Sequence, residues 1–571
     1  MVTPTSGTVG TVITLRGNGY SAIQSIRIAF GTTLSIQNVT TTAYGSWTIS
    51  FTIDTQPYSI TTIVAHQDNI GIKAVGTLSI QPQVFLVTPQ QGSVGTIVTV
   101  RGNGYGASVL IRIKFGTTMT IVNTSTYVEG SWTTTFTIDT QRFGTKSVTA
   151  YQGALKADNW LKILPNIILV TPRQGTVGAF ITLRGNGFGA SNLIRIEFGT
   201  NKTIVTTSTY AHGSWTTTFT INTQPFGLTT IKAYDTGITA EDVSATDTLT
   251  IQPKIIFVTP IIGTVGSIIT VWGNGFGLSE TIDITFGTNM TLTQCSSTEY
   301  GSFNTTFTID TQPYGTTTIT GCGMQTGTSA ISFFQISQRI IFLDPGTGTV
   351  DTVVTLRGNG YGGSEVVRIH FGTNWTIALV TAEACGSWTV TFSIDTQPYG
   401  KTTMHAIGMI SGTSAISGVD GTHTMGYFFI LPRITLLSPT EGVVGVTVTI
   451  EGDGYKVSPP DTPYVIVEFG GHPQIAYKQP NENSGTVCIT FVVNSQSFGT
   501  KTIKAYSQGE QPLCEVQKLF KILPRITLIT PDFMPPNTEI RIEGNGYGES
   551  ELIRIDFGTI FTIAITTASK D

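Results

Sequence analysis

A glycine-rich run is the first pattern in the chain that could support chemistry. Residues Gly102 to Gly106, GNGYG, have the glycine density of a phosphate-binding loop. Such a loop binds phosphate through the free N–H groups of a helix N-terminus, and the residues after GNGYG have the pattern of a strand. We therefore interpret GNGYG as a turn and not as a nucleotide site.

Histidines and aspartates give no clear catalytic or metal site. The six histidines are His66, His212, His370, His405, His423 and His472. They are scattered along the chain without the spacing of metal ligands, so we expect structural roles.

A recurring DTQP motif places an aspartate at Asp54, Asp139, Asp310 and Asp395. Asn222 and Asn494 replace this aspartate in two copies, which favours a turn cap over a calcium ligand. No Ser/His/Asp set and no close carboxylate pair stands out. We expect no enzyme, no cofactor and no metal site.

The five cysteines allow two disulfides. Cys295 and Cys322 share one repeat, and Cys488 and Cys514 share another, so each pair could be bridged in an oxidising compartment. Buried free thiols are the alternative, because the sibling repeats contain no cysteine. Cys385 has no partner within its repeat.

Six N-glycosylation sequons occur, at Asn38, Asn123, Asn201, Asn289, Asn304 and Asn374. In a chain so rich in threonine, this number is close to what chance gives. Position carries more information, because Asn201, Asn289 and Asn374 each follow an FGT turn in successive repeats. A hairpin tip can carry a glycan without disturbing strand pairing, so we expect glycosylation there if the protein is secreted.

The element that positions all of these residues is a repeat of 83 to 94 residues. Its signature, TPTSGTVGTVITLRGNGY at Thr3 to Tyr20, returns six times with light changes. The closing GNGY, GNGF or GDGY begins at Gly17, Gly102, Gly185, Gly273, Gly358, Gly452 and Gly544. A period of this length is typical of one small domain and too long for a solenoid repeat.

Each repeat has the pattern of a β-sandwich. Trp47, Ile49, Phe51 and Ile53 alternate with polar residues, which predicts a strand with one buried face. Turn signals such as FGT and DTQPYG recur every eight to twelve residues, and no helical period occurs. About seven strands per repeat predict an antiparallel sandwich, and the chain as a whole is predicted to be all-β.

The order of Pro, Gly, Gly, an apolar strand and G-x-G-Y/F resembles the start of IPT/TIG domains, from Pro4 through Pro89, Pro172, Pro260, Pro345, Pro439 and Pro531. The resemblance covers six full repeats and half of a seventh. It implies tandem immunoglobulin-like β-sandwiches. The family includes receptors, adhesins, enzyme spacers and transcription factors, so the resemblance implies a fold more than a function.

The repeats give seven expected domains with almost no linker between them. Their boundaries are 1–81, 82–164, 165–252, 253–338, 339–431, 432–523 and a partial repeat at 524–571. Junctions such as Ser79 to Pro89 (SIQPQVFLVTP) pass from one repeat to the next through one proline. Without a Gly/Ser spacer, neighbouring repeats should keep a constant angle and form a rod.

Composition excludes several classes of function. Charged residues make up 12% of the chain and the net charge is −4, without a basic cluster for nucleic acid. No apolar run reaches the roughly 20 residues of a membrane helix. The seventh repeat stops after its FGT hairpin, so either another copy supplies the missing strands or, as we favour, the polypeptide continues.

Two functions fit these features. The first, which we favour, is an extracellular or cell-surface structural protein whose rods assemble with other copies into a filament, sheath or stalk. Its nearly uncharged threonine faces, such as Thr133, Thr135 and Thr137, would contact sister chains or glycans. The alternative is a spacer that presents an adhesive or catalytic domain outside this sequence.

Overall fold

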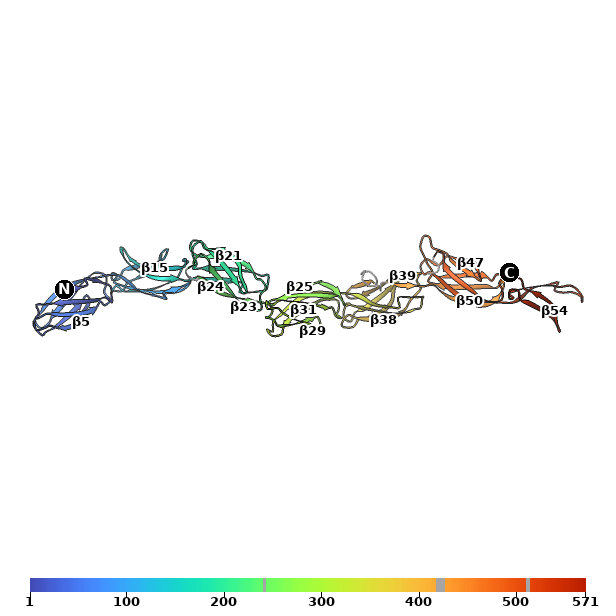
Figure 1. Ribbon diagram of the computed structural model, residues 1–571, viewed down its shortest axis with the longest axis horizontal. Helices are drawn as coiled ribbons and strands as arrows, with labels where there is room; N and C mark the ends of the chain where they lie inside the picture. The colour runs from blue at the N-terminus through green and yellow to red at the C-terminus, as the bar shows by residue number, and fades with distance from the viewer. Residues whose placement is uncertain (240–242, 417–426, 510–513, 571) are drawn as a thin grey trace.

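The computed structural model describes residues 1–239, 243–416, 427–509 and 514–570. These residues form strands and turns without an α-helix, in the all-β architecture that the alternating patterns predict. None of them forms a helix able to cross a lipid bilayer. Figure 1 shows the sandwiches following one another along a single long axis, with the chain termini at opposite ends.

Repeat 2 shows the plan of each sandwich. Its first sheet has the order β9-β11-β14, and its second sheet has the order β10-β16-β15-β12-β13. The chain passes from β9 to β10, and so from one sheet to the other, at the cis bond between Thr88 and Pro89. This distribution of strands over two facing sheets is immunoglobulin-like.

The three-stranded sheets of repeats 1 to 6 consist of β1 (Val2–Thr3), β3 (Val12–Gly17) and β6 (Trp47–Thr52); β9 (Gln83–Thr88), β11 (Ile97–Asn103) and β14 (Trp132–Thr137); β17 (Asn166–Thr171), β19 (Phe180–Asn186) and β22 (Trp215–Thr220); β25 (Lys254–Thr259), β27 (Ile268–Asn274) and β30 (Phe303–Thr308); β33 (Arg339–Asp344), β35 (Val353–Asn359) and β38 (Trp388–Ser393); and β43 (Arg433–Ser438), β45 (Thr447–Asp453) and β48 (Val487–Val492).

The facing sheets of repeats 1, 2, 3, 4 and 6 have five strands each. In that order of repeats, they consist of β2 (Ser6–Gly7), β4 (Ser25–Phe30), β5 (Thr33–Thr40), β7 (Ile60–Gln67) and β8 (Ile72–Ile80); β10 (Gln91–Gly92), β12 (Leu110–Phe115), β13 (Thr118–Ser125), β15 (Gly144–Gln152) and β16 (Leu155–Ile163); β18 (Gln174–Gly175), β20 (Leu193–Phe198), β21 (Asn201–Ser208), β23 (Gly227–Asp235) and β24 (Ser244–Ile251); β26 (Ile262–Thr264), β28 (Thr281–Phe286), β29 (Asn289–Ser296), β31 (Gly315–Gly323) and β32 (Ser329–Ser337); and β44 (Glu441–Val443), β46 (Val465–Phe469), β47 (His472–Lys478), β49 (Gly499–Ser507) and β50 (Glu515–Leu523).

Repeats 5 and 7 depart from this plan. In repeat 5 the facing sheet is split into β34 (Thr347–Gly348), β42 (Phe428–Ile430) and β39 (Gly400–Thr402), and into β37 (Asn374–Thr381), β36 (Val366–Phe371), β40 (Met404–Gly408) and β41 (Ser414–Ile416). Repeat 7 has two hairpins, β51 (Arg525–Thr530) with β52 (Arg541–Asn545), and β53 (Leu552–Phe557) with β54 (Ile560–Thr567).

One pairing differs from the fully antiparallel expectation. The two-residue strand β10 runs parallel to the last strand, β16, because the chain has already crossed between the sheets when it reaches β10. The same short parallel pairing recurs in repeats 1 and 3 to 6, for example between β18 and β24. The repeat boundaries given above stay a prediction.

Each core is built around the strand that begins with tryptophan in most repeats. Along β14 the side chains of Trp132 and Phe136 are buried, while Thr133 and Thr135 face solvent. The Trp132 ring contacts Tyr105 of the GNGY turn edge to face, with 6.1 Å between ring centroids. Burying one large aromatic against another therefore connects the turn to the middle of the sandwich.

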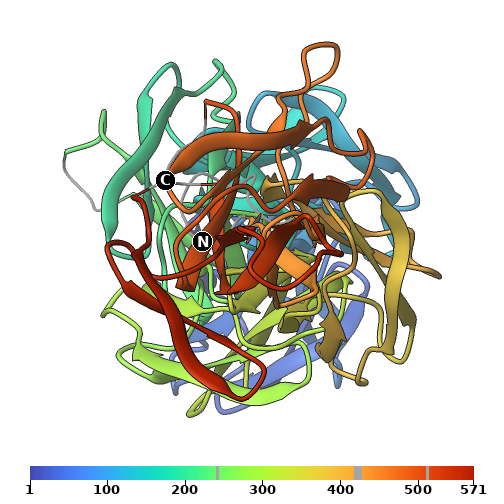
Figure 2. The same cartoon turned by 90° about the vertical axis from the view of Figure 1, so that its right-hand side faces the viewer.

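Successive sandwiches are rotated about the long axis. In the view down that axis, the differently coloured repeats overlie one another and project in different directions (Figure 2). The array is therefore a twisted rod, and the predicted rod shape is confirmed.

Candidate functional site: the joints between repeats

The recurring DTQP loop is tied first to its own repeat. In repeat 1, the Gln56 side chain is 1% exposed and its Oε1 accepts a hydrogen bond from the N–H of Thr32 at 3.3 Å. Its Nε2 donates to Asp54 Oδ1 at 2.8 Å, and Asp54 Oδ2 accepts from the Thr33 hydroxyl at 2.6 Å. These part-buried hydrogen bonds hold the loop against the FGT hairpin and give the buried Gln56 side chain its partners.

The residue that follows the DTQP motif then binds the next repeat. The N–H of Tyr58 in repeat 1 donates to the carbonyl of Tyr105, in the GNGY turn of repeat 2, at 2.8 Å. The same bond recurs at every joint, with lengths of 2.8 to 3.1 Å: Phe143 to Phe188, Phe226 to Phe276, Tyr314 to Tyr361, Tyr399 to Tyr455 and Phe498 to Tyr547. The two most regular sequence motifs are therefore the two halves of one inter-repeat contact.

A glycine lets the two repeats approach closely at this point. Gly130 has φ +72°, and a Cβ there would lie 2.7 Å from the Cα of Pro57 in the preceding repeat. Gly301 meets Pro225 at 2.7 Å, Gly386 meets Pro313 at 2.8 Å and Gly485 meets Pro398 at 2.9 Å in the same way. A side chain at this glycine would force the repeats apart.

The connecting peptide makes a third contact. A Cβ on Gly104 of the GNGY turn would lie 3.2 Å from the Cα of Pro82, the proline that links repeats 1 and 2. Gly187 and Gly275 have the same relation to Pro165 and Pro253, each at 3.2 Å. The joints between repeats 1 and 2 and between repeats 3 and 4 therefore have three contacts, namely the connecting peptide, the backbone hydrogen bond and the Gly–Pro approach. At the joint between repeats 2 and 3, Gly213 meets Arg142 in place of a proline.

The aromatic side chain at the joint also extends into the neighbouring core. Phe143 of repeat 2 packs against the hydrophobic core of repeat 3, and Tyr399 of repeat 5 packs against that of repeat 6. Asn186 of the GNGF turn donates to the Thr140 hydroxyl across the joint at 3.2 Å. Both halves of the joint therefore exclude water from a shared surface.

An ion-pair network distinguishes the joint between repeats 5 and 6. Arg433 of repeat 6 binds Asp453 of its own GDGY turn at 3.0 Å and Asp351 of repeat 5 at 2.7 Å. Burial raises the pKa of Asp453, and the Arg433 guanidinium opposes this rise. Asp351 has φ +66° at a position that glycine occupies in other repeats, such as Gly10 and Gly95 at +91°.

A backbone N–H of the turn that follows GNGY donates to a side-chain acceptor. This acceptor comes from a different part of the chain in different repeats. In repeat 2, Gln152 on β15 accepts from the N–H of Gly106 at 2.7 Å. In repeat 5, Glu365 does so for Gly362 at 2.5 Å, from the turn itself, and it also accepts from the N–H of Ser411 at 2.9 Å. Burial alone would raise the pKa of Glu365, but the donors from Ser411 and Gly362 outweigh burial and hold this pKa below its usual value.

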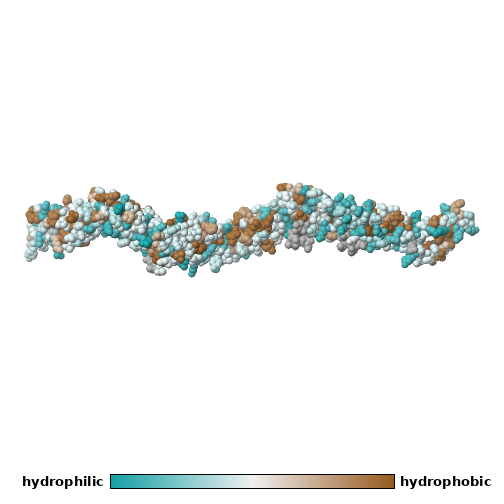
Figure 3. Space-filling view, turned by 90° about the horizontal axis from the view of Figure 1, so that it is seen from above, coloured by the Kyte–Doolittle hydropathy of each residue, from teal (hydrophilic) through white to brown (hydrophobic). Residues whose placement is uncertain are grey.

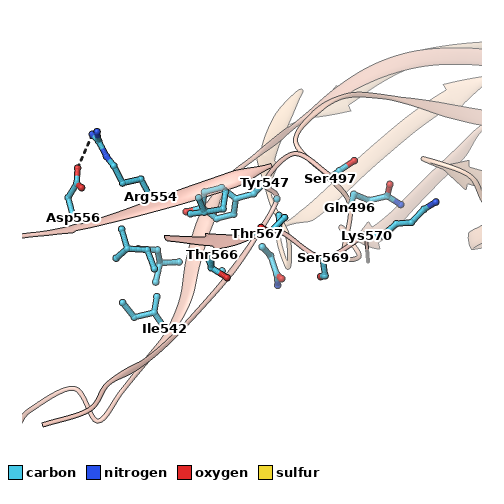
Figure 4. Close-up of a pocket in the computed structure, with 17 residues that line it drawn as sticks. Gln496, Ser497, Ile542, Tyr547, Arg554, Asp556, Thr566, Thr567, Ser569 and Lys570 are labelled. Atoms are coloured by element: carbon cyan, nitrogen blue, oxygen red, sulfur yellow. Dashed lines mark hydrogen bonds and ion pairs between the residues drawn. The ribbon is translucent and has the colours of Figure 1, made fainter. Parts of the chain in front are cut away.

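A hollow of about 410 Å³ lies beside the joint between repeats 6 and 7. Figure 4 shows Tyr547 and Ile542 facing it from repeat 7, with Gln496 and Ser497 of repeat 6 at one end. In repeat 2 the matching space is filled by the strands that follow β13, which carry Trp132 and Phe136. The hollow is therefore the uncovered core side of two hairpins.

The GNGYG interpretation as a turn agrees with this geometry, because the motif forms the acceptor half of the joint. Asp54 ties its loop through a side-chain hydrogen bond to Thr33, and in repeat 4 Asp310 accepts from the N–H of Thr311 at 2.6 Å. Among the described residues, no group of three or more His, Cys, Asp or Glu side chains could hold a metal ion.

Neither of the two disulfides that the cysteine spacing allows is present in this structure. Cys295 lies on β29 and Cys322 on β31, with β28 between them. Two strand spacings are roughly 9 to 10 Å, which exceeds the reach of a disulfide. Cys488 is exposed on the outer face of β48, whereas Cys514 is buried in the core, so these thiols face different environments.

The predicted glycosylation sites differ in exposure. Asn38, Asn123 and Asn304 are exposed, whereas Asn201 and Asn374 at the FGT turns are half-buried. Asn374 Nδ2 also donates to Asp395 at 2.7 Å. The side chain of Asn289 lies outside the described part of its strand. Glycosylation at all six positions stays a prediction.

The structure brings together two histidines that sequence reasoning had treated as separate. His370 on β36 and His405 on β40 are directly opposite in the antiparallel register, and Trp375 stacks on His370. Burial, and then the charge of His370, lower the pKa of His405. The register of the neighbouring strands is the signal that could have paired these two histidines, since both lie on strands of one repeat. His423 lies outside the described residues.

Comparisons with known proteins give distant similarities. No protein-family model matches the chain. Human Fibrocystin-L is 28% identical over 259 residues, which is 42% of this chain and 6% of that protein. This chain therefore spans a small fraction of the curated relative that it matches.

Among solved structures, the eight N-terminal immunoglobulin domains of Down Syndrome Cell Adhesion Molecule are 12% identical. The match covers 91% of this chain and 84% of that chain, with a TM-score of 0.16. Invasin, a bacterial integrin-binding protein, is 14% identical, with 60% of this chain and 81% of that chain covered and a TM-score of 0.16.

Proposed function

We propose that this chain is a non-enzymatic structural protein of the cell surface or extracellular space, built as a stiff rod from IPT/TIG-like repeats. The single observation that carries this proposal is the recurrence of one backbone hydrogen bond, of 2.8 to 3.1 Å, at all six joints. Repeats that were free to swivel would have no physical reason to present the same donor and acceptor at each junction.

Stiffness follows from the separation of the contacts within each joint. Bending about the connecting peptide at Pro82 would break the bond from Tyr58 to Tyr105 or drive Pro57 into Gly130. One backbone hydrogen bond contributes only about 0.5 to 1.5 kcal/mol. The bond therefore acts together with apolar packing, such as that of Phe143 on the next core.

We further propose that the rods associate laterally with other copies of the chain, as a filament, sheath or stalk. Figure 3 shows apolar and weakly polar surface distributed along the whole rod. Exposed side chains such as Phe257 and Trp272, with ring centroids 5.8 Å apart, add apolar contact area. Only 12% of residues are charged, so little electrostatic repulsion opposes association.

Electron microscopy of negatively stained protein tests this assembly. We expect fibres built from parallel rods. Isolated straight rods would contradict lateral assembly and favour the alternative, a spacer that presents a binding or catalytic domain outside this sequence.

A charged variant makes the assembly test specific. Thr133, Thr135 and Thr137 face outward on β14, so T133K/T135K/T137K should dissolve fibres at low salt without unfolding repeat 2. The matched T133S/T135S/T137S variant should assemble as the wild type does.

A further inference from the structure

The outer face of repeat 5 holds a histidine pair that the rod function does not use. His370 on β36 and His405 on β40 form a directly opposed cross-strand pair. Both side chains are half-buried, and their ring centroids are 5.2 Å apart. The Trp375 ring lies parallel to His370 at 4.7 Å on this face and is itself exposed.

The separation of the two rings is that of ligands on one ion. A tetrahedral divalent ion with bonds of about 2.0 to 2.1 Å to one nitrogen of each imidazole holds the two ring centroids about 5 Å apart. The observed 5.2 Å agrees with this value, so small side-chain rotations, without backbone movement, would direct one nitrogen of each ring at a common point.

Each ring also has a nitrogen without a hydrogen-bond partner among the described residues. His370 Nε2 lies 3.0 Å from the carbonyl of Gly372, so it carries the proton and Nδ1 keeps its lone pair. His405 contacts the His370 ring and makes no hydrogen bond to a described residue through its own ring. Imidazole nitrogens with free lone pairs are good ligands for Zn²⁺, Ni²⁺ and Cu²⁺.

The corresponding positions in other repeats carry ordinary cross-strand pairs. Repeat 3 has Glu197 opposite Lys232, and repeat 6 has Glu468 opposite Lys504. Opposite charges at facing cross-strand positions favour strand pairing. Two protonated histidines cannot stabilise the sheet in this way, because like charges repel. A cation bound between them would instead hold the two strands together.

We propose that His370 and His405 form a surface site for a borderline-soft divalent cation such as Zn²⁺, which joins β36 to β40. Because the described residues contain no cluster of three or more His, Cys, Asp and Glu ligands, water completes the coordination. The remaining positions of the ion are open to a ligand from outside the chain.

Isothermal titration of the full chain with Zn²⁺ tests this site. We expect one site of micromolar affinity, weakened by roughly an order of magnitude or more in H370N and in H405N. H212N is the matched control, because His212 stacks on Tyr210 but has no second histidine beside it. An unchanged affinity in either pair variant, or an equal loss in H212N, would overturn the proposal.

Fluorescence locates the ion independently. Bound Cu²⁺ should quench Trp375, so W375F should lose the quenching that H370N also loses, while Zn²⁺ binding to W375F persists. Circular dichroism of each variant checks folding. Quenching that persists in both W375F and H370N would place the ion elsewhere and refute the site.

Discussion

At the residue scale, the first glycine of GNGY is required by the tryptophan opposite it. A Cβ on Gly102 would overlap the indole ring of Trp132, and Gly185 has the same relation to Trp215. In repeat 4 the tryptophan is replaced by Phe303, which still covers Gly273. The turn motif therefore preserves space for the aromatic core as well as the joint.

We expect G102A to destabilise repeat 2 by about 1 to 3 kcal/mol, because the methyl group overpacks a buried ring. Urea unfolding monitored by tryptophan fluorescence measures the change. G346A is the matched control, since a Cβ at Gly346 meets nothing within 4 Å. Equal effects of the two variants would contradict this role for Gly102.

Glu365 predicts a local dependence on pH. Its pKa is lowered in the folded state, so the ionised carboxylate stabilises the turn above about pH 4.3, the pKa of a free glutamate, and this stability is lost as the pH falls through the lower folded value. Hydrogen-exchange protection of residues 408–413 should fall over that acid range, after correction for intrinsic rates.

Repeat 2 contains a natural control for this effect. Gln152 accepts the equivalent bond from Gly106 and does not titrate, so protection at 152–155 should stay constant over the same range. E365Q should remove the acid dependence in repeat 5. A persistent dependence in E365Q would assign it to another group.

At the element scale, the joint was the main feature that sequence patterns did not reveal. Alternation along strands such as β14 predicted which side chains are buried, and the burial pattern confirms it. The cross-repeat bond joins Tyr58 to Tyr105, which belong to different units, and no periodicity within one unit encodes such a contact. Cysteine pairing has a related limit, because cysteine spacing does not reveal that β28 separates Cys295 from Cys322.

We expect G386A to bend the joint between repeats 4 and 5, because its Cβ would lie 2.8 Å from the Cα of Pro313. Inter-repeat angles in single-particle images measure the bend. G45A is the matched control, since Gly45 has a similar φ, +74° against +77°, and the same clash with its own tyrosine carbonyl, but the atoms nearest its Cβ all belong to Tyr20. If neither variant bends a joint, the Gly–Pro contact does not set the angle between repeats.

The ion pair between Arg433 and Asp351 predicts that one substitution has opposite effects on the stability of repeat 5 and on the stiffness of its joint with repeat 6. D351G removes the strain of a positive φ at a non-glycine residue, which should stabilise repeat 5 by about 1 kcal/mol. It also removes the solvent-exposed ion pair with Arg433, which costs about 0 to 1 kcal/mol. Repeat 5 should therefore keep or gain stability, while the angle between repeats 5 and 6 varies more widely at low salt. A clear loss of stability of repeat 5 would contradict this balance.

At the scale of the whole molecule, the stiffness of the rod depends on six equivalent joints acting in series. Each joint reuses one loop, one turn and one connecting peptide, so the stiffness of the rod is a property of the repeat and not of any special junction. Sequence patterns predicted the rod from the absence of linkers, and the joint contacts supply its physical cause.

Small-angle X-ray scattering from dispersed single chains tests this central claim most directly. We expect the intensity at intermediate angles to fall as the inverse of the scattering vector, the law for a rigid rod. The steeper fall of a flexible chain of beads would show that the repeats swivel, and would contradict the account.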